Sequence, residues 1–390
     1  MYIEYKQKKP EQKLFMDIDD IKLEFRDGEP DSQSMLIKGD NLKVMKHLIQ
    51  EKNLKGKVDL VYIDPPFGTK NLFKVSEKKA NSISRSNDGE IAYDDSLVND
   101  DYLEFIRERL ILIRELLSEK GSVYVHIDCK VGHYIKVIMD EIFGRDHFIN
   151  DLTRIKCNPK NFERKGYGNT KDMILFYSKT SKYIWHLQTS KYDVDDVARL
   201  FKKVDQDGRR YTTVPVHAPG ETKNGKTGGE WKGMLPPKGR HWRVSPQELD
   251  ELDSKGLIEW SRNGVPRRKI FAEERKLKGK KIQDILDFKD PQNPNYPTEK
   301  NMDLIKLFIR SSSDEGSLVL DCFAGSGTTI LSSIELGRKW IGIDSSDKAI
   351  ETIRGRLKKK QSELISSDYG FYEAVDLGVL KETRSSILQN

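Results

Sequence analysis

The sequence feature that constrains the fold most is an apolar run that ends in a carboxylate and two prolines. Residues 58–63 are mostly β-branched or apolar, a pattern typical of a buried strand in an α/β sheet. Asp64 follows, and Pro65 and Pro66 end the strand because proline lacks a backbone N–H and restricts the residue before it. Phe67 completes the turn. Open α/β sheets bind ligands at the carboxyl ends of their strands, so these residues are candidates for a site; an ordinary strand end is the alternative.

A second apolar run, residues 317–321, leads into a loop with two glycines. Gly325 and Gly327 let the backbone approach a ligand, and the helix that starts after them offers N–H groups. The next strand, residues 339–344, ends in Asp344, which lies 344 − 327 = 17 residues beyond Gly327. An acidic residue about 20 positions beyond such a glycine loop can accept hydrogen bonds from the hydroxyl groups of a ribose. Because no Gly-Lys-Ser/Thr follows the glycines, the loop is not a phosphate-binding loop. We interpret it as a site for a cofactor that contains adenosine but no pyrophosphate, with a plain βαβ turn as the alternative.

Composition sets outer bounds on the protein. The 390 residues allow two domains or one domain with an insertion, and the net charge of +6 does not by itself indicate a nucleic-acid partner. Cys129, Cys157 and Cys322 lie far apart and give neither a disulfide framework nor zinc spacing, as expected in a reducing compartment. The chain shows no signal peptide and no long apolar run, so we expect neither secretion nor a membrane span.

Strands and helices alternate through much of the chain, which predicts a largely parallel sheet. We expect strands at 34–40, 122–128 and 173–177, and helices at 41–51, 101–117, 131–143 and 301–311. Asp40 ends the first of these strands, where it can cap the following helix. His126 lies within an apolar strand and is expected to be a packed or hydrogen-bonded core residue. The polar stretch 68–100 is interpreted as a long loop, either a lid that orders on nucleic acid or a disordered segment.

Basic residues concentrate in two regions. The first, residues 152–177, includes Lys156, Lys160, Arg164 and Lys165. The second, residues 181–292, breaks the strand–helix alternation, contains four of the five tryptophans and includes Arg240, Arg267, Arg268 and Lys269. Basic residues interleaved with aromatic ones fit phosphate positioning and base contact, whereas a solvated basic surface is the alternative.

The Asp64-Pro65-Pro66-Phe67 turn together with the Phe323-Ala324-Gly325-Ser326-Gly327 loop resembles the amino-methyltransferases of DNA, which use S-adenosylmethionine. The turn precedes the loop, an order that resembles the beta class of these enzymes. Most of residues 34–360 are similar to adenine-specific methylases of the type III modification-subunit kind. The resemblance implies an α/β fold: a circularly permuted Rossmann-like methyltransferase fold with a mostly parallel sheet and an inserted target-recognition domain.

The resemblance also divides the chain and assigns roles to residues. It implies a catalytic half at 34–180, a target-recognition insert at 181–292 and a cofactor-binding half at 293–360. Residues 1–33 are polar and mixed in charge and are interpreted as a peripheral segment. Residues 361–390 carry no motif and are interpreted as an oligomer contact or a loose tail. The catalytic turn is Asp64, Pro65, Pro66 and Phe67. Cofactor contacts are expected from Asp40, Thr298, Lys300, Asp321, Phe323, Ala324, Gly325, Ser326, Gly327, Thr328 and Asp344. Thr298 and Lys300 match the family's Pro-Thr-x-Lys-Pro segment, in which Asn301 replaces the last proline. The two basic regions supply the expected DNA contacts.

The implied reaction methylates the exocyclic amino group of a base that has left the double helix. The lone pair of that nitrogen is delocalised into the ring. Asp64 and the Pro65 carbonyl, by accepting its N–H groups, would aim the lone pair at the methyl group while Phe67 stacks on the base. No metal is needed. The aspartate favours adenine N6, with cytosine N4 as the alternative.

The expected partner is double-stranded DNA, in a restriction-modification or epigenetic system of a prokaryotic cytoplasm. The sequence leaves open a homodimer, a separate restriction subunit, transfer to RNA or protein, and a non-catalytic DNA-binding specificity subunit.

Overall fold

The computed structural model describes residues 2–16, 21–66, 71–76, 79–80, 90–95, 100–159, 163, 165–222, 225–291, 299–362 and 368–377. The chain forms two compact units, Met1–Leu187 with Gln283–Asn390, and Gln188–Ile282. The second unit is shorter than the insert expected at 181–292, because the segments that lead into and out of it belong to the first unit.

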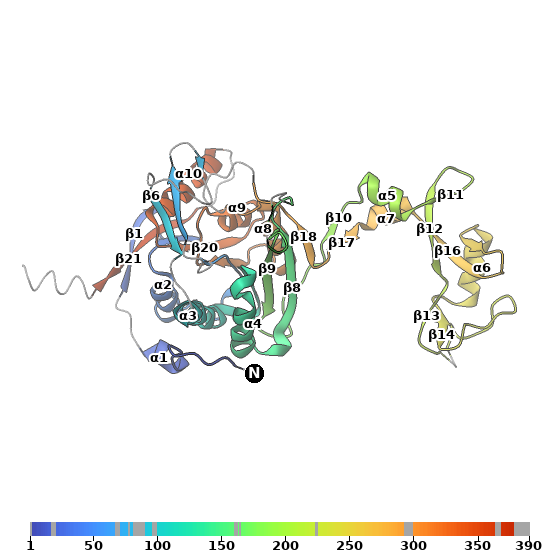
Figure 1. Ribbon diagram of the computed structural model, residues 1–390, viewed down its shortest axis with the longest axis horizontal. Helices are drawn as coiled ribbons and strands as arrows, with labels where there is room; N and C mark the ends of the chain where they lie inside the picture. The colour runs from blue at the N-terminus through green and yellow to red at the C-terminus, as the bar shows by residue number, and fades with distance from the viewer. Residues whose placement is uncertain are drawn as a thin grey trace, which may run out of the picture. The chain divides into compact units, whose positions relative to one another are not determined.

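A ten-stranded mixed sheet forms the centre of the first unit (Figure 1). Its strand order is β1 (Ile21–Gly28), β21 (Gly370–Asp376), β2 (Met35–Lys38), β20 (Lys339–Asp344), β19 (Leu318–Asp321), β3 (Val58–Ile63), β7 (Leu117–Ile127), β9 (Lys171–Ser178), β8 (Phe148–Ile155) and β18 (Ile285–Asp287). The strands from β21 to β7 all pair in parallel, and the antiparallel pairs lie toward the two edges. The α/β class is therefore confirmed, with a parallel centre and mixed edges.

Helices cover both faces of this sheet. They are α1 (Glu11–Met16), α2 (Asn41–Gln50), α3 (Asp100–Leu116), α4 (Cys129–Phe143), α8 (Met302–Ser312), α9 (Thr328–Glu335) and α10 (Asp347–Ser362). Figure 1 shows α2, α3 and α4 on one face and α8, α9 and α10 on the other. Side chains alternate along a strand, so Ile37 of β2 packs in the first helical layer and Leu36 in the second. Within the described ranges, no helix has the length and apolar character that a membrane crossing requires.

Three segments differ from the sequence-based expectation. The segment at 1–33 supplies the edge strand β1, and the tail at 361–390 supplies β21, which pairs with β1 and β2. The stretch interpreted as a loop at 68–100 contains an antiparallel sheet of β4 (Asn71–Ser76), β5 (Lys79–Ala80) and β6 (Glu90–Asp95) in its described parts. The loop interpretation is wrong there, because short strands in polar sequence gain their stability from pairing rather than from an apolar pattern.

The second unit has its own sheet and core. Its four-stranded antiparallel sheet runs β11 (Lys203–Val204), β12 (Arg210–Pro215), β16 (Pro266–Phe271) and β15 (Ile258–Trp260). The remaining elements are the pairs β13 (His217–Pro219) with β14 (Arg240–Trp242) and β10 (Thr189–Ser190) with β17 (Lys280–Lys281), and helices α5 (Val194–Leu200), α6 (Pro246–Ser254) and α7 (Ala272–Lys278). Trp231 and Trp242 are 2% exposed and pack together with Leu249. These two tryptophans are therefore core residues and not surface groups available to a base.

Candidate active site

Asp64 follows β3, beside the carboxyl end of β19. The two strands pair in parallel, with Leu320 opposite Val61. The helices that follow them, α3 after β3 and α9 after β19, cover opposite faces of the sheet (Figure 1). Open α/β sheets bind ligands where neighbouring strands send their connections to opposite faces. The sheet thus brings the Asp64 turn and the glycine loop to one place.

The two carboxylate oxygens of Asp64 have different surroundings. Oδ2 forms an ion pair with the Lys300 ammonium, whose side chain is 10% exposed. Oδ1 is buried and has no hydrogen-bond partner among the described residues. A buried polar atom without a partner costs on the order of 1–3 kcal/mol, so a ligand that donates a hydrogen bond to this oxygen would be stabilised. Lys300, expected to contact the cofactor, thus also contacts Asp64, the carboxylate predicted to be catalytic.

The structure describes only some of the other residues predicted for the Asp64 turn and for the segment that carries Lys300. Pro65 is buried and Pro66 is half-buried. Phe67 and Thr298 lie outside the described residues, so their roles stay predictions.

The Asp344 carboxylate, at the end of β20, accepts one hydrogen bond from the glycine loop between β19 and α9 and one from the turn that follows β20. The Gly325 N–H donates to Asp344 Oδ2 at 2.8 Å, and the Ser346 N–H donates to Oδ1 at 2.9 Å. Burial raises the pKa of Asp344. Gly327 has φ 78°, and a Cβ there would lie 2.8 Å from Ile353, so the position requires glycine. Each Asp344 oxygen can still accept a second hydrogen bond, which suits ribose hydroxyls.

Asp321, at the end of β19, braces the start of the loop. Its Oδ1 accepts the Phe323 N–H at 3.0 Å, and its Oδ2 accepts the Thr329 hydroxyl at 2.6 Å. Burial raises the pKa of Asp321 to about 7, although each of these two hydrogen bonds by itself lowers that pKa. One oxygen is thus engaged by the loop and the other by the first turn of α9, so the structure assigns Asp321 to the support of the loop.

Substituting Asp321→Asn is expected to make stability less dependent on pH. The folded-state pKa is about 7, above the ordinary 3.8, so the stability that this carboxyl contributes is full below pH 4 and is lost as the pH rises through 7. The slope in that window is on the order of 1 kcal/mol per pH unit. Urea unfolding at pH 5 and pH 7 should show a smaller difference for Asp321→Asn than for the unmodified protein. Equal differences would contradict the assignment.

Arg356 on α10 ties the segment that carries Lys300 to the glycine loop. Its NH1 group donates to the Ser326 carbonyl at 2.9 Å and forms an ion pair with Glu299 at 2.9 Å. The buried hydroxyls of Ser326 and Thr328 are 3.0 Å apart. The two segments predicted to hold the cofactor are therefore joined. Sequence reasoning missed Arg356, because it lies in a helix with many basic residues and matches no motif.

Asp40 caps α2 and lines a cavity of about 450 Å³. It accepts the Lys43 N–H at 3.1 Å and lies 3.4 Å from Arg109. The Arg109 guanidinium stacks on the Phe105 ring at 3.5 Å, and that ring contacts the Phe323 ring of the glycine loop, with 6.0 Å between centroids. Asp40 is thus a helix cap that also lines a cavity linked to the glycine loop through Phe105, and both interpretations of this residue remain compatible. Ala324, the next residue of the loop, is buried in the core beside α9.

The basic residues of the β8–β9 hairpin do not share one role. The Lys156 ammonium, predicted to contact DNA, is 2.6 Å from the Asp172 carboxylate, so its charge is compensated within the fold. Lys165 is exposed. Lys160 and Arg164 lie outside the described residues.

In the second unit, β16 carries Arg267, Arg268 and Lys269. Because side chains alternate along a strand, Arg267 and Lys269 face one side and Arg268 faces the other. Arg267 is held by 2.9 Å hydrogen bonds to the hydroxyl and carbonyl of Thr213. Arg240 donates to His217 Nδ1 at 3.1 Å. Within the described part of this unit, no acidic side chain pairs with Arg240 or Arg267, so their charges are available to a ligand.

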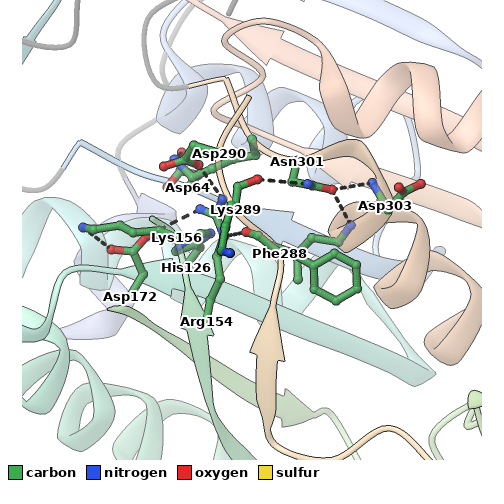
Figure 2. A network of polar contacts seen from close by, with 12 residues as sticks. Asp64, His126, Arg154, Lys156, Asp172, Phe288, Lys289, Asp290, Asn301 and Asp303 are labelled. Atoms are coloured by element: carbon green, nitrogen blue, oxygen red, sulfur yellow. Dashed lines mark hydrogen bonds and ion pairs between the residues drawn. The ribbon is translucent and has the colours of Figure 1, made fainter. Parts of the chain in front are cut away.

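His126 is a core residue, as predicted. Its side chain is fully buried, and its ring nitrogens contact Tyr62 and Asp172. Figure 2 shows it within a polar network that also holds Arg154 and Lys156. The sequence analysis singled out neither Arg154, which lies in the first basic region, nor Asp172, although a lone charge in an apolar strand is a signal for a buried pair.

Comparisons with known proteins identify the family of this chain. Residues 58–355 match the DNA methylase family, which covers both N6 and N4 transfer. The type II methyltransferase M.EcaI of Enterobacter cloacae is 44% identical over 323 residues, 81% of this chain and 68% of that protein. The StyLTI Mod subunit of a type III restriction-modification enzyme of Salmonella typhimurium is 28% identical over 76% of this chain and 49% of its own length, so the chain spans about half of that relative. Among solved structures, the M1.HpyAVI–SAM complex has a TM-score of 0.43 at 18% identity and covers 83% of this chain and 99% of that chain.

Proposed function

The chain belongs to the DNA methylase family, and we propose that it is a site-specific enzyme that methylates the N6 amino group of a flipped adenine in double-stranded DNA. The observation that carries this proposal is the buried Oδ1 of Asp64, which has no hydrogen-bond partner among the described residues and lies at the sheet edge that also holds the glycine loop. An exocyclic amino group donates two hydrogen bonds. Asp64 Oδ1 can accept one of them, and the Pro65 carbonyl is the proposed acceptor of the other.

The residues fit S-adenosylmethionine as the cofactor. Gly325 and Gly327 both have positive φ, which lets the backbone of the loop approach a ligand closely, and Asp344 retains hydrogen-bonding capacity for ribose. When bound, this cofactor supplies an activated methyl group. Gly325, Ser326 and Asp344 would hold its ribose and methionine parts, and Asp40 its adenine end.

The chain's own groups then prepare the amino nitrogen. Asp64 turns its free oxygen toward the N–H, while the Lys300 ammonium holds the other oxygen and fixes the carboxylate plane. Both acceptors draw the amino hydrogens out of the plane of the base, which returns the lone pair to the nitrogen. A fixed acceptor geometry lowers the barrier because no reorganisation is needed during the reaction.

The choice of adenine rests on the aspartate at the first position of the catalytic turn. Cytosine N4 is the second candidate, because the family includes both kinds of transfer. We further propose that the protein acts in the bacterial cytoplasm in restriction-modification, and that any cleavage requires a separate restriction subunit, since type III Mod subunits are among its relatives. Self-association to a homodimer is part of the same proposal.

Transfer of labelled methyl groups from S-adenosylmethionine to unmethylated bacterial DNA tests the function directly. Nucleoside analysis of the digested DNA should show N6-methyladenine. N4-methylcytosine would correct the target base and keep the mechanism. If cofactor binds but no methyl group reaches DNA, the proposal fails, and RNA or protein becomes the substrate to test.

The double substitution Arg240→Ala, Arg267→Ala is expected to weaken DNA binding about 10-fold and to lower the salt slope of log K by about 1 for each phosphate contact removed. These guanidiniums are anchored, and no acidic side chain among the residues that the structure describes pairs with them, so both can reach phosphate. Anisotropy titrations of a labelled DNA duplex between 50 and 200 mM salt measure the slope. Arg209→Ala is the matched control, since Arg209 already pairs with Asp205. An unchanged slope in the double variant would remove these residues from the interface.

A further inference from the structure

A buried charged network lies near the catalytic turn and has no part in the proposed chemistry. Arg154 and His126 are fully buried, and Asp172 is 3% exposed. Burying charges is costly unless they are paired, and apolar residues of similar size can often replace such groups without loss of stability. The network is therefore better understood through what it holds in place, and Figure 2 shows His126, Asp172 and Arg154 together with Asp290.

One end of the network reaches β3, the strand that leads to Asp64. Because a carboxylate only accepts hydrogen bonds, His126 Nε2 donates to Asp172 Oδ2 at 3.1 Å. Its Nδ1 then accepts the Tyr62 hydroxyl at 2.8 Å. Burial lowers the pKa of His126, in keeping with this neutral tautomer. Tyr62 is two residues before Asp64, on the same side of the strand.

The other end of the network contacts residues 288–290, which follow β18 and are called the returning segment below. Arg154 Nε donates to the Phe288 carbonyl at 2.8 Å, and its NH2 group pairs with Asp290. The backbone N–H of Asp290 donates to the Lys156 carbonyl at 2.8 Å. This segment is thus attached to β8 by both side-chain and main-chain contacts.

Asn301 connects the attached segment to Lys300. Its Nδ2 donates to the Lys289 carbonyl at 2.9 Å, and its Oδ1 accepts the N–H groups of Asp303 and Leu304 as the cap of α8. Asn301 stands where the resembling enzymes have a proline. An asparagine here does what a proline could not, because it fixes the returning segment and the start of α8 to each other.

We propose that Arg154 and Asp290 are positioning residues that set Lys300 against Asp64. The contacts form a closed ring. Asp64 pairs with Lys300, and the neighbouring Asn301 binds the returning segment, which Arg154 holds through Asp290. Arg154 NH1 lies 3.5 Å from Asp172, and Asp172 and His126 lead back to Tyr62 on the strand of Asp64. The ring joins the two segments that carry the ion pair. This inference rests on the proposed function, because it gives the ion pair a role in methyl transfer.

A double-mutant cycle tests whether Asp290 acts through Lys300. Asp290→Ala should lower kcat about 10-fold and change the KM for DNA and the cofactor Kd by less than about 2-fold. In a Lys300→Met background the same substitution should lower kcat little further, because the effects of coupled residues are not additive. Asp287→Ala is the matched control, since Asp287 is an exposed acid three residues earlier on β18. It should leave kcat unchanged. Equal losses from Asp290→Ala in both backgrounds would overturn the proposal.

Amide hydrogen exchange supplies a readout that does not depend on catalysis. Asp290→Ala should speed exchange at the first turn of α8, at Asp303 and Leu304, and Asp287→Ala should not. Arg154→Lys, which keeps the charge but not the fork of donors, should reproduce the effect of Asp290→Ala in both measurements. Unchanged exchange in Asp290→Ala would refute the ring. If the unmodified protein does not methylate DNA at all, the proposed function fails while the exchange data still decide whether the ring exists.

Discussion

The Asp64→Ala variant is expected to lose methyl transfer by a factor of about 10³ or more, equivalent to about 4 kcal/mol of transition-state stabilisation, while the cofactor Kd changes by less than about 3-fold. The substitution removes the buried acceptor Oδ1, so the amino nitrogen keeps its lone pair delocalised in the base. It also leaves Lys300 without its carboxylate partner. The glycine loop and Asp344 do not depend on Asp64, which is why cofactor binding should persist. Single-turnover methyl transfer and equilibrium cofactor binding measure the two effects separately.

Two further variants make this result specific. Asp64→Asn keeps the shape and one acceptor oxygen but loses the charge that pairs with Lys300, so it should retain at most a small residual rate. Asp59→Ala on the same strand is the control, because the Asp59 carboxylate accepts a hydrogen bond from Ser118 at 2.7 Å near the opposite end of β3. It should keep normal turnover. Full activity in Asp64→Ala would end the assignment of the catalytic turn.

The sequence was sufficient for the parts of the site that depend on strand ends. The apolar run before Asp64 and the one before Asp321 each predict a buried strand, and carboxyl ends of parallel strands meet at one edge of a sheet. Asp344 was found by the same rule. The loop conformation that requires Gly327 was also expected, since two glycines after a strand mark a close approach of the backbone.

The contacts between distant segments could not be predicted in this way. The pairing of Asp64 with Lys300 depends on how a segment more than two hundred residues away returns to the sheet, and no local pattern encodes that. The same holds for the clamp between Arg154 and Asp290. Arg154 sits opposite Asp172 in the β8–β9 hairpin, so a correct hairpin register would have suggested at least that pair. Strands β1 and β21 were missed because edge strands of mixed polarity carry a weak signal.

The Lys300→Met variant separates the two roles that Lys300 can have. A residue that mainly binds the cofactor would, when lost, raise the cofactor Kd strongly and leave kcat near normal at saturation. A residue that mainly orients Asp64 would lower kcat at saturating cofactor and DNA. Since the ammonium pairs with Asp64 and both side chains are largely buried, we expect a fall in kcat of about 10²-fold with the cofactor Kd changed less than about 5-fold.

Methionine is the informative substitution because it preserves most of the length and the apolar stem of lysine while removing the charge. Lys300→Arg is the conservative variant and should recover part of the rate, since a guanidinium can still pair with Asp64. Lys306→Met serves as the control on the following helix, where the lysine pairs with Glu335 and is partly buried like Lys300. A cofactor Kd that rises as much as kcat falls would show that Lys300 serves the cofactor rather than Asp64. That result would also remove the basis for a ring of contacts that converges on this ion pair.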